Sequence, residues 1–448
     1  MIPRLQLRTP RLLPVYLERA PKRSFEIQLE HLRERLGGLV EWLEPAPIDA
    51  AADAAASAIV VPDLSGAAYH RLDAFRAIER PILVITSEFG TVSMWDWEIR
   101  DHLRRRGIAT IAPLSLQESE DICRALALKE TLAAAKMLAY QDDLGAGMQP
   151  DVFKRFYWWE DECVQQMHER FGVRVEHRSF RELSARASAV PDDRATAVLE
   201  RIGDRLPMPG LDLHAKLDAL RIYVALGDEL DEAGPVVAAG INCLNESMSS
   251  TTTPCLAWNL LFEERGLLWG CEADLAAMMT ELLVHKSLGV PVMMSNLYPF
   301  LMGDAALKHE RIPYFPEVDE PQHHVLVAHC GYFGVVPESF ATTWALRPRV
   351  LEIVDPNAHA IDARIPEGPT AVVKLAGTMD TLVMSQATLT GYVQYEDSDC
   401  LNGAVLRVED GYRFVERLPS HHAILATGDL GRRLDVVAQV LALGVERI

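Results

Sequence analysis

VVAAGINC, at residues 236–243, is the first of four short apolar stretches that decide the fold of this chain. The three that follow it are GLLWGCEAD (266–274), VPVMMSN (290–296) and HHVLVAHCG (323–331). A continuous apolar run is typical of a strand that is covered on both faces, as in a parallel sheet. The series therefore predicts βαβ units whose right-handed crossovers place four strands in one parallel sheet.

The helices between the first three stretches are indicated by their apolar spacing and by their ends. CLAWNLLFEERG (255–266) follows a proline and stops at a glycine, which is a common helix terminator. The next helix carries five apolar residues at the spacing of one buried stripe. They are Leu275, Met278, Met279, Leu282 and Leu283. Gly289 and Pro291 end this helix, and the next apolar stretch begins there.

Polar side chains follow each predicted strand at its carboxyl end. Glu246, Glu272, Asn296 and His329 are the residues at these positions, and one parallel sheet would bring them to a shared rim. Ligand sites of open α/β sheets form in the crevice at this rim. Carboxylates together with a histidine suit a divalent cation of the Mn²⁺ or Mg²⁺ kind better than a thiolate-seeking metal.

A purely structural role is open for each of these residues. Glu272 and Asp274 fall in the first turn of a helix, where the dipole alone favours acids. Asn296 could be a turn or cap residue, and His329 could be a hydrogen-bonded core histidine. Glu246 could simply cap a loop. The sequence does not choose between these roles and a metal site.

The sequence before this region alternates strand-like and helical patterns. SAIVVP (57–62) and PILVIT (81–86) are short runs rich in β-branched residues, and each precedes a polar loop and helical sequence. This alternation predicts βαβ units. We therefore expect an N-terminal α/β domain over residues 1–130 and a central α/β domain over 131–315.

The sequence after residue 345 changes character, because strand-like runs follow one another with little helix between them. AVVKLAG (371–377), TLVMSQATLTGY (381–392) and HHAILATG (421–428) are examples. We expect a C-terminal antiparallel β-rich domain over residues 316–448 that contains His329 and His422. Successive residues of a strand point to opposite faces, so at most one of His421 and His422 faces a given cavity.

Composition and charge exclude several classes of function. The 448 residues carry 44 Lys and Arg against 64 Asp and Glu, for a net charge of −20, so a nucleic-acid-binding role is disfavoured. No run approaches the roughly 18 apolar residues of a membrane span, and the prolines near the N-terminus interrupt any signal-peptide core. The seven cysteines form no C-x-x-C pair, which predicts reduced thiols and a cytoplasmic protein.

Common catalytic and nucleotide-binding motifs are missing from the sequence. There is no G-x-x-x-x-G-K-[ST], no G-x-G-x-x-G after a strand, no G-x-S-x-G and no H-E-x-x-H. Trp95 and Trp97 could line a sugar-binding surface, although a place in an aromatic core is the more frequent explanation.

Five segments, taken in order, carry a resemblance to a known family. They are INCLNES (241–247), GLLWGCEAD with its helix, PVMMSN (291–296), HCG (329–331) and HHAILATGDL (421–430). This series resembles the L-fucose isomerase/L-arabinose isomerase superfamily, and most closely its shorter fucose isomerase-like branch. The resemblance covers about residues 215–448, and it extends to the N-terminal half by architecture only.

The resemblance implies both a fold and an activity. Members have two Rossmann-like (flavodoxin-like) parallel-sheet domains plus a C-terminal antiparallel β domain, and they assemble as homo-trimers or homo-hexamers. They are metal-dependent aldose–ketose isomerases, usually with Mn²⁺, although Mg²⁺ or Co²⁺ is another choice. Carried over by position, the resemblance implies that Glu272 is a metal ligand and acid/base carboxylate. It also implies that His422 is a metal ligand and His329 an extra one.

Asn296 departs from the family pattern. The spacing 296 − 272 = 24 puts this amide where the family has its second metal carboxylate. An amide oxygen can bind a hard cation, but an amide cannot transfer the proton that an ene-diol isomerisation requires. Glu246 is the first candidate for a substitute carboxylate, and Asp380 is a weaker one. The alternative is a catalytically altered or inactive homologue that binds carbohydrate.

Overall fold

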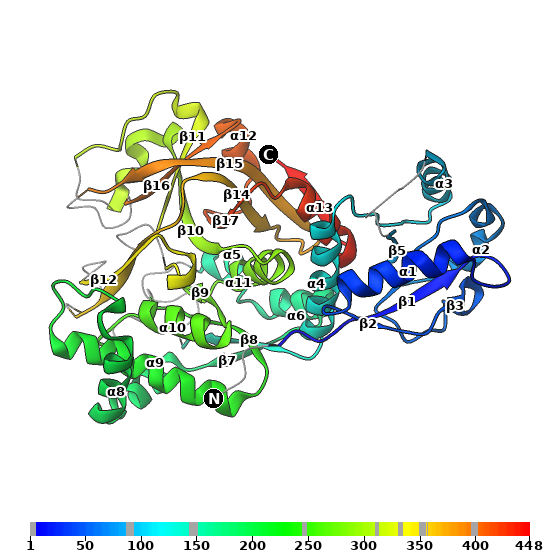
Figure 1. Ribbon diagram of the computed structural model, residues 1–448. Coiled ribbons are helices and arrows are strands. Elements are labelled where there is room, and N and C mark those ends of the chain that lie inside the picture. The colour runs from blue at the N-terminus through cyan, green and yellow to red at the C-terminus, as the bar shows by residue number, and fades with distance from the viewer. Residues whose placement is uncertain are drawn as a thin grey trace.

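The computed structural model shows a mixed α/β protein with two parallel sheets and a closed antiparallel barrel (Figure 1). The residues that the structure describes are 6–86, 94–142, 151–243, 249–309, 313–329, 335–348, 355, 357–395 and 402–448. Among these residues, no helix has the length and apolar character needed to cross a membrane. The cysteines at 123, 163, 243, 255 and 271 are free thiols, as the sequence predicts.

The first parallel sheet is built from the N-terminal part of the chain, drawn in blue in Figure 1. Its strand order is β2-β1-β4-β5, with β3 also paired to β1. The strands are β1 (Arg11–Tyr16), β2 (Glu41–Trp42), β3 (Ala46–Pro47), β4 (Ala58–Val61) and β5 (Ile82–Val84). The helices are α1 (Arg23–Leu36), α2 (Leu72–Arg76), α3 (Met94–Arg104) and α4 (Leu116–Leu132). The runs at 57–62 and 81–86 are thus strands of a parallel sheet, which confirms the βαβ prediction.

The second parallel sheet has the order β7-β6-β8-β9. Its strands are β6 (Lys136–Tyr140), β7 (Arg174–Arg178), β8 (Val236–Ile241) and β9 (Leu268–Cys271). Its helices are α5 (Val152–Phe156), α6 (Asp161–Phe171), α7 (Phe180–Ser188), α8 (Asp192–Ile202), α9 (Leu213–Ala233), α10 (Cys255–Arg265) and α11 (Leu275–Glu281). A π-helical turn over Leu282–Lys286 extends α11, so the predicted apolar stripe lies on one continuous helix.

The third sheet is antiparallel except for β18, which pairs in parallel fashion with β15, and its other six strands close into a barrel. Its seven strands run in the order β14-β17-β10-β11-β16-β15-β18, and β14 also pairs with β15, so that all but β18 form a barrel. The strands are β10 (Val292–Pro299), β11 (His324–Ala328), β14 (Gly368–Leu375), β15 (Thr381–Val393), β16 (Gly403–Val408), β17 (His422–Thr427) and β18 (Gly444–Arg447). Helices α12 (Gly411–Arg417) and α13 (Gly431–Leu441) accompany them, and β12 (Thr343–Pro348) pairs separately with β13 (His359–Arg364).

The prediction of four successive strands in one parallel sheet is wrong for the last two. Strands β10 and β11 pair with each other in antiparallel fashion and belong to the barrel, which therefore includes a strand from before residue 316. A barrel strand that is covered on its outer face by a helix is apolar on both faces, as a parallel strand is. The apolar pattern alone does not separate the two cases.

Helix α11 joins the second parallel sheet to the barrel. It contacts β8 and β9 on one side and β10, β14 and β17 on the other (Figure 1). The approach to the sheet is close, because a Cβ atom at Gly270 would lie 2.5 Å from Cγ of Met278. The carboxyl ends of β8 and β9 thus lie beside the barrel, and the candidate site forms where they meet.

Candidate functional site

The site is organised around a sharp turn between β9 and α11. Glu272 and Ala273 both adopt left-handed backbone conformations, with φ of 54° and 53°, although neither is glycine. Such conformations cost roughly 1–2 kcal/mol per residue and persist where surrounding contacts fix them, which is frequent at functional sites. The amide of Ala273 donates to the carbonyl oxygen of Ile241 at 3.1 Å, which ties the turn to the end of β8.

A buried aromatic segment between α5 and α6 supports this turn. The Trp159 indole donates to the Ala273 carbonyl at 2.9 Å, and the Leu275 amide donates to the Tyr157 carbonyl at 3.0 Å. The Tyr157 hydroxyl donates to Oε2 of Glu272 at 3.1 Å. Burial and the nearby acids raise the pKa of Tyr157, which therefore keeps its proton and remains a donor. These contacts come from the short connection between the end of α5 at Phe156 and the start of α6 at Asp161.

The first residue of β17, His422, reaches the start of α11. Its Nδ1 lies 3.0 Å from Oδ2 of Asp274, and Nζ of Lys374 lies 3.3 Å from the same oxygen. Burial alone would raise the pKa of Asp274, but the Lys374 charge and the His422 hydrogen bond outweigh it and hold that pKa at about 2. An ionised carboxylate only accepts hydrogen bonds, so Nδ1 of His422 carries the hydrogen.

This tautomer determines what His422 presents to Glu272. The Nε2 atom of the buried imidazole has no hydrogen-bond partner among the described residues, and it lies 3.6 Å from Oε1 of Glu272. Stacking on the Tyr157 ring, with ring centres 4.8 Å apart and planes 5° apart, fixes the imidazole plane. A separation of 3.6 Å is too long for a hydrogen bond. When Nε2 carries no proton, this nitrogen and the carboxylate oxygen are two electron-pair donors that face each other, which is an arrangement suited to a cation.

Two further residues selected from the sequence lie beside this pair. Asn296 is directly opposite His422 in the β10–β17 ladder, so the two side chains share a face of the sheet. Its Oδ1 is buried and has no hydrogen-bond partner among the residues that the structure describes. His329 follows the last residue of β11, and its Nε2 lies 2.9 Å from Sγ of Cys271, the residue before Glu272.

The structure therefore brings Glu272, Asn296 and His422 together, although by a different route from the one predicted, and it places His329 against Cys271. Asn296 lies within β10 rather than after a strand. His422 is the first residue of β17, and His329 directly follows β11, so three of the four residues come from the barrel strands or their ends. Glu246 lies outside the described residues. Asp380 is exposed in the turn between β14 and β15, where it accepts hydrogen bonds from Thr378 and Thr381, and these contacts fit a structural turn residue.

The residues fit a divalent cation only in part. Within the described ranges, no group of three His, Cys, Asp or Glu side chains forms a ready ligand set. The atoms suited to coordination are Oε1 of Glu272, Nε2 of His422 and Oδ1 of Asn296, and the last two are buried without hydrogen-bond partners in the part of the chain that the structure describes. One imidazole, one carboxylate and one amide make a hard-to-borderline donor set with a single negative charge.

Sequence reasoning missed three residues of the site. Asp274 was expected to be a helix-start acid, and its Oδ1 does cap α11 by accepting from the Ala277 amide, but Oδ2 also holds His422. Lys374, 2 % exposed, is a lone charge inside the apolar run AVVKLAG, and that isolation was a usable signal of a buried ion pair. Nothing in the sequence singles out Tyr157.

No model of a known protein family matches the chain, and no curated protein matches it either.

Proposed function

We propose that this protein is a metal-dependent aldose–ketose isomerase that acts on an open-chain sugar through an ene-diol intermediate. The observation that carries the proposal is the meeting of Glu272 and His422, whose facing atoms are 3.6 Å apart in a buried site. The resemblance to the fucose isomerase-like branch selects these same two residues from the sequence. Two Rossmann-like domains, a homo-trimeric or homo-hexameric assembly and a cytoplasmic location belong to the same proposal.

A divalent cation, Mn²⁺ first and Mg²⁺ or Co²⁺ otherwise, would be held by Glu272 and His422, with Asn296 as a neutral third ligand. Bound there, it would supply a Lewis acid for two neighbouring oxygens of the sugar. Asp274 keeps the hydrogen of His422 on Nδ1, so that Nε2 offers its electron pair to the site. His329 lies at the end of β11 and contacts Cys271, and its imidazole is the candidate for a further nitrogen ligand.

Proton transfer falls to the carboxylate of Glu272. In the proposed step a C2–H bond breaks, the same proton forms the new C1–H bond, and the hydroxyl proton passes between O1 and O2. The Tyr157 hydroxyl donates to Oε2 of Glu272 and so orients the carboxylate with Oε1 toward His422. Glu246 is the alternative base that the sequence offers.

Asn296 favours a second candidate function. An isomerase of this kind uses a second carboxylate, and here the position opposite His422 holds an uncharged amide. A protein that keeps the pocket but lacks proton transfer would bind carbohydrate without converting it. The two functions differ in one measurable property, which is turnover of a bound sugar.

Glu272→Gln tests the proposal, because it keeps the size of the side chain and removes its charge. With Mn²⁺ present, we expect wild-type protein to bind the ion in equilibrium dialysis and to interconvert at least one aldose–ketose pair. The variant should lose at least tenfold in Mn²⁺ affinity and roughly 10²–10⁴-fold in turnover. Glu416→Gln, on the exposed face of α12, is the matched control and should leave both unchanged.

Each of the alternative outcomes leads to a specific conclusion about the mechanism. Conversion that continues at the full rate in a chelator overturns the metal-dependent mechanism. Sugar binding by both wild type and Glu272→Gln, with no turnover by either, supports the carbohydrate-binding function instead. A Glu272→Gln variant with full turnover removes this residue from the chemistry.

A further inference from the structure

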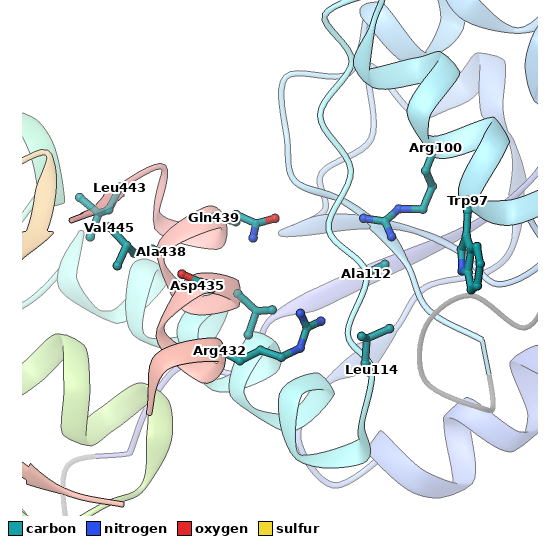
Figure 2. A pocket seen from close by; sticks show the side chains of 11 residues that line it. Trp97, Arg100, Ala112, Leu114, Arg432, Asp435, Ala438, Gln439, Leu443 and Val445 are labelled. Carbon is teal, nitrogen blue, oxygen red and sulfur yellow. The ribbon is translucent and has the colours of Figure 1, made fainter. Parts of the chain in front are cut away.

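A second cavity lies away from this site, between the N-terminal part of the chain and helix α13. Figure 2 shows α3 on one side of the cleft and α13 on the other, with the segment that carries Ala112 and Leu114 between them. Its volume is about 690 Å³, which is within the range of small-molecule sites. None of its lining residues belongs to the candidate isomerase site.

Two guanidinium groups enter this cleft from opposite sides. In Figure 2, Arg100 extends from α3 and Arg432 from α13, and both side chains reach toward the segment between the helices. The Arg100 guanidinium donates to Oγ1 and the carbonyl oxygen of Thr110, at 3.3 and 3.4 Å, so its hydrogen-bond partners are neutral. Burial lowers the pKa of Arg100, and the charges of Arg104 and Arg432 lower it further, whereas the charge of Asp96 acts in the opposite direction.

The carboxylates near the cleft are already engaged. Arg432 binds Glu118 through Nε and Nη2, at 2.6 and 3.3 Å, which leaves its Nη1 for a ligand. Asp435 is bound by Arg447 at 2.6 Å. Asp96 also acts on Arg100, so the cations Arg100, Arg432 and Arg447 are matched in number by the anions Asp96, Glu118 and Asp435. Of these groups, Arg100 and Arg432 are the cations that line the cleft, so an anion placed between them would meet a guanidinium group on each wall.

An apolar surface lines the same cleft. The side chains of Trp97 and Leu114 are 63 % and 56 % exposed, respectively. The expectation of an aromatic core position is thus wrong for Trp97, whose indole faces the cleft and the solvent. Exposed aromatic surface beside converging polar groups is typical of ligand sites.

We infer that this cleft binds a small phosphorylated metabolite, with its phosphate between Arg100 and Arg432 and its carbon skeleton against Trp97. A phosphate suits this arrangement better than a carboxylate does. It carries up to two charges and directs its oxygens tetrahedrally, so two guanidinium groups on opposite walls can bind it at once. A planar carboxylate, with a single charge, is satisfied by one guanidinium.

Titration calorimetry with inorganic phosphate, glucose 6-phosphate and glucose tests this inference. We expect glucose 6-phosphate to bind most tightly, inorganic phosphate more weakly, and glucose not measurably. Arg100→Gln should weaken binding of both phosphates at least tenfold. Arg105→Gln is the matched control, because it removes the same charge from the residue that directly follows the same helix and does not line the cleft, and it should stay within twofold of wild type.

Two further variants keep the test independent of folding and of the isomerase site. Gln439→Glu adds a negative charge at an exposed cleft position and should weaken phosphate binding without disturbing the Arg100–Thr110 contacts. Trp97→Ala should weaken glucose 6-phosphate and spare inorganic phosphate, whereas Glu272→Gln should bind both as wild type does. Equal binding by Arg100→Gln and Arg105→Gln, or no binding of either phosphate by wild type, would overturn the inference.

Discussion

His422 and Asp274 are separated by 148 positions in the sequence, yet the imidazole Nδ1 of one lies 3.0 Å from a carboxylate oxygen of the other. Both residues are fully buried, and the Asp274 carboxylate also pairs with the buried Lys374. A single acid therefore fixes the tautomer of the histidine, neutralises a buried lysine and caps α11 through its second oxygen. Through these three contacts Asp274 links α11 to the barrel strands β14 and β17 and to the candidate site.

Replacement of Asp274 by Asn separates its charge from its capping role. Asn is as good a helix cap as Asp, so α11 should still begin at the same residue. Burial lowers the pKa of Lys374, and Asp274 is the acid that does most to stabilise its charge, with Glu281 contributing less. Loss of one partner of a buried pair costs roughly 3–5 kcal/mol of unfolding free energy. We expect urea denaturation to report a loss of this size.

The double variant Asp274→Asn/Lys374→Met tests whether the cost comes from the stranded charge. It removes both partners, so it should be less destabilised than the sum of the two single variants. Asp73→Asn, at a fully exposed aspartate of α2, should change stability by no more than about 0.5 kcal/mol. Additive single-variant costs would show that the ion pair contributes nothing of its own.

Tyr157→Phe isolates the hydroxyl that donates to Glu272. The ring remains, so stacking on His422 should persist and the imidazole should keep its orientation. A hydrogen bond to a charged group contributes about 1.5–3 kcal/mol, so sugar isomerisation should slow roughly 10- to 100-fold while Mn²⁺ affinity stays within about threefold. Tyr412→Phe, on exposed α12, is the control. If Mn²⁺ affinity fell as much as the rate, the hydroxyl would be needed for the conformation of the turn at Glu272 and not only for the orientation of the carboxylate.

The sequence predicts β8, α10, β9 and α11 well, because local patterns decide them. Strands β8 and β9 are continuous apolar runs, α11 has a five-residue stripe, and glycines mark the helix ends. The same patterns fail for β10 and β11, since strand direction depends on which partner the strand meets and not on its own residues. The antiparallel C-terminal strands were predictable from their short connections, which leave little room for crossover helices.

For the candidate site, local sequence patterns identify some of the residues but not the contacts between them. Glu272 and His329 could be selected because they end apolar runs, and Asn296 because of its spacing from Glu272. The contacts of Asp274 with His422 and Lys374, and that of Tyr157 with Glu272, join elements that are distant in sequence. Such pairings leave no periodic trace, so only the folded structure reveals them.

Gly240 permits the turn that presents Glu272, and its replacement by Ala should disturb that turn. A Cβ atom at this position would lie 2.8 Å from Cα of Ala273 and 2.9 Å from the carbonyl oxygen of Gly270. Both are backbone atoms, so the relief of this clash must move the turn. We expect a loss of about 1–3 kcal/mol in the free energy of unfolding and weaker Mn²⁺ binding. Gly38→Ala, where a Cβ meets nothing within 4 Å, is the control. Wild-type metal affinity in Gly240→Ala would contradict the assigned role of this glycine.

His359 should make the protein less stable as the pH falls below neutrality. Burial lowers the pKa of this histidine to about 4, from its usual 6.5, and its Nδ1 lies 3.0 Å from the Thr252 hydroxyl. Below pH 6.5 the unfolded chain binds a proton at this residue that the folded protein does not take up until about pH 4. The free energy of unfolding therefore declines across this interval, by on the order of 3 kcal/mol.

Other histidines contribute to the same decline, so the test compares the pH dependence of each variant with that of the wild-type protein. Chemical denaturation of His359→Gln between pH 7 and pH 4.5 should give a shallower slope than wild type, whereas His31→Gln, exposed on α1, should follow the wild-type curve. Parallel slopes for His359→Gln and wild type would show that the buried imidazole does not control this pH dependence.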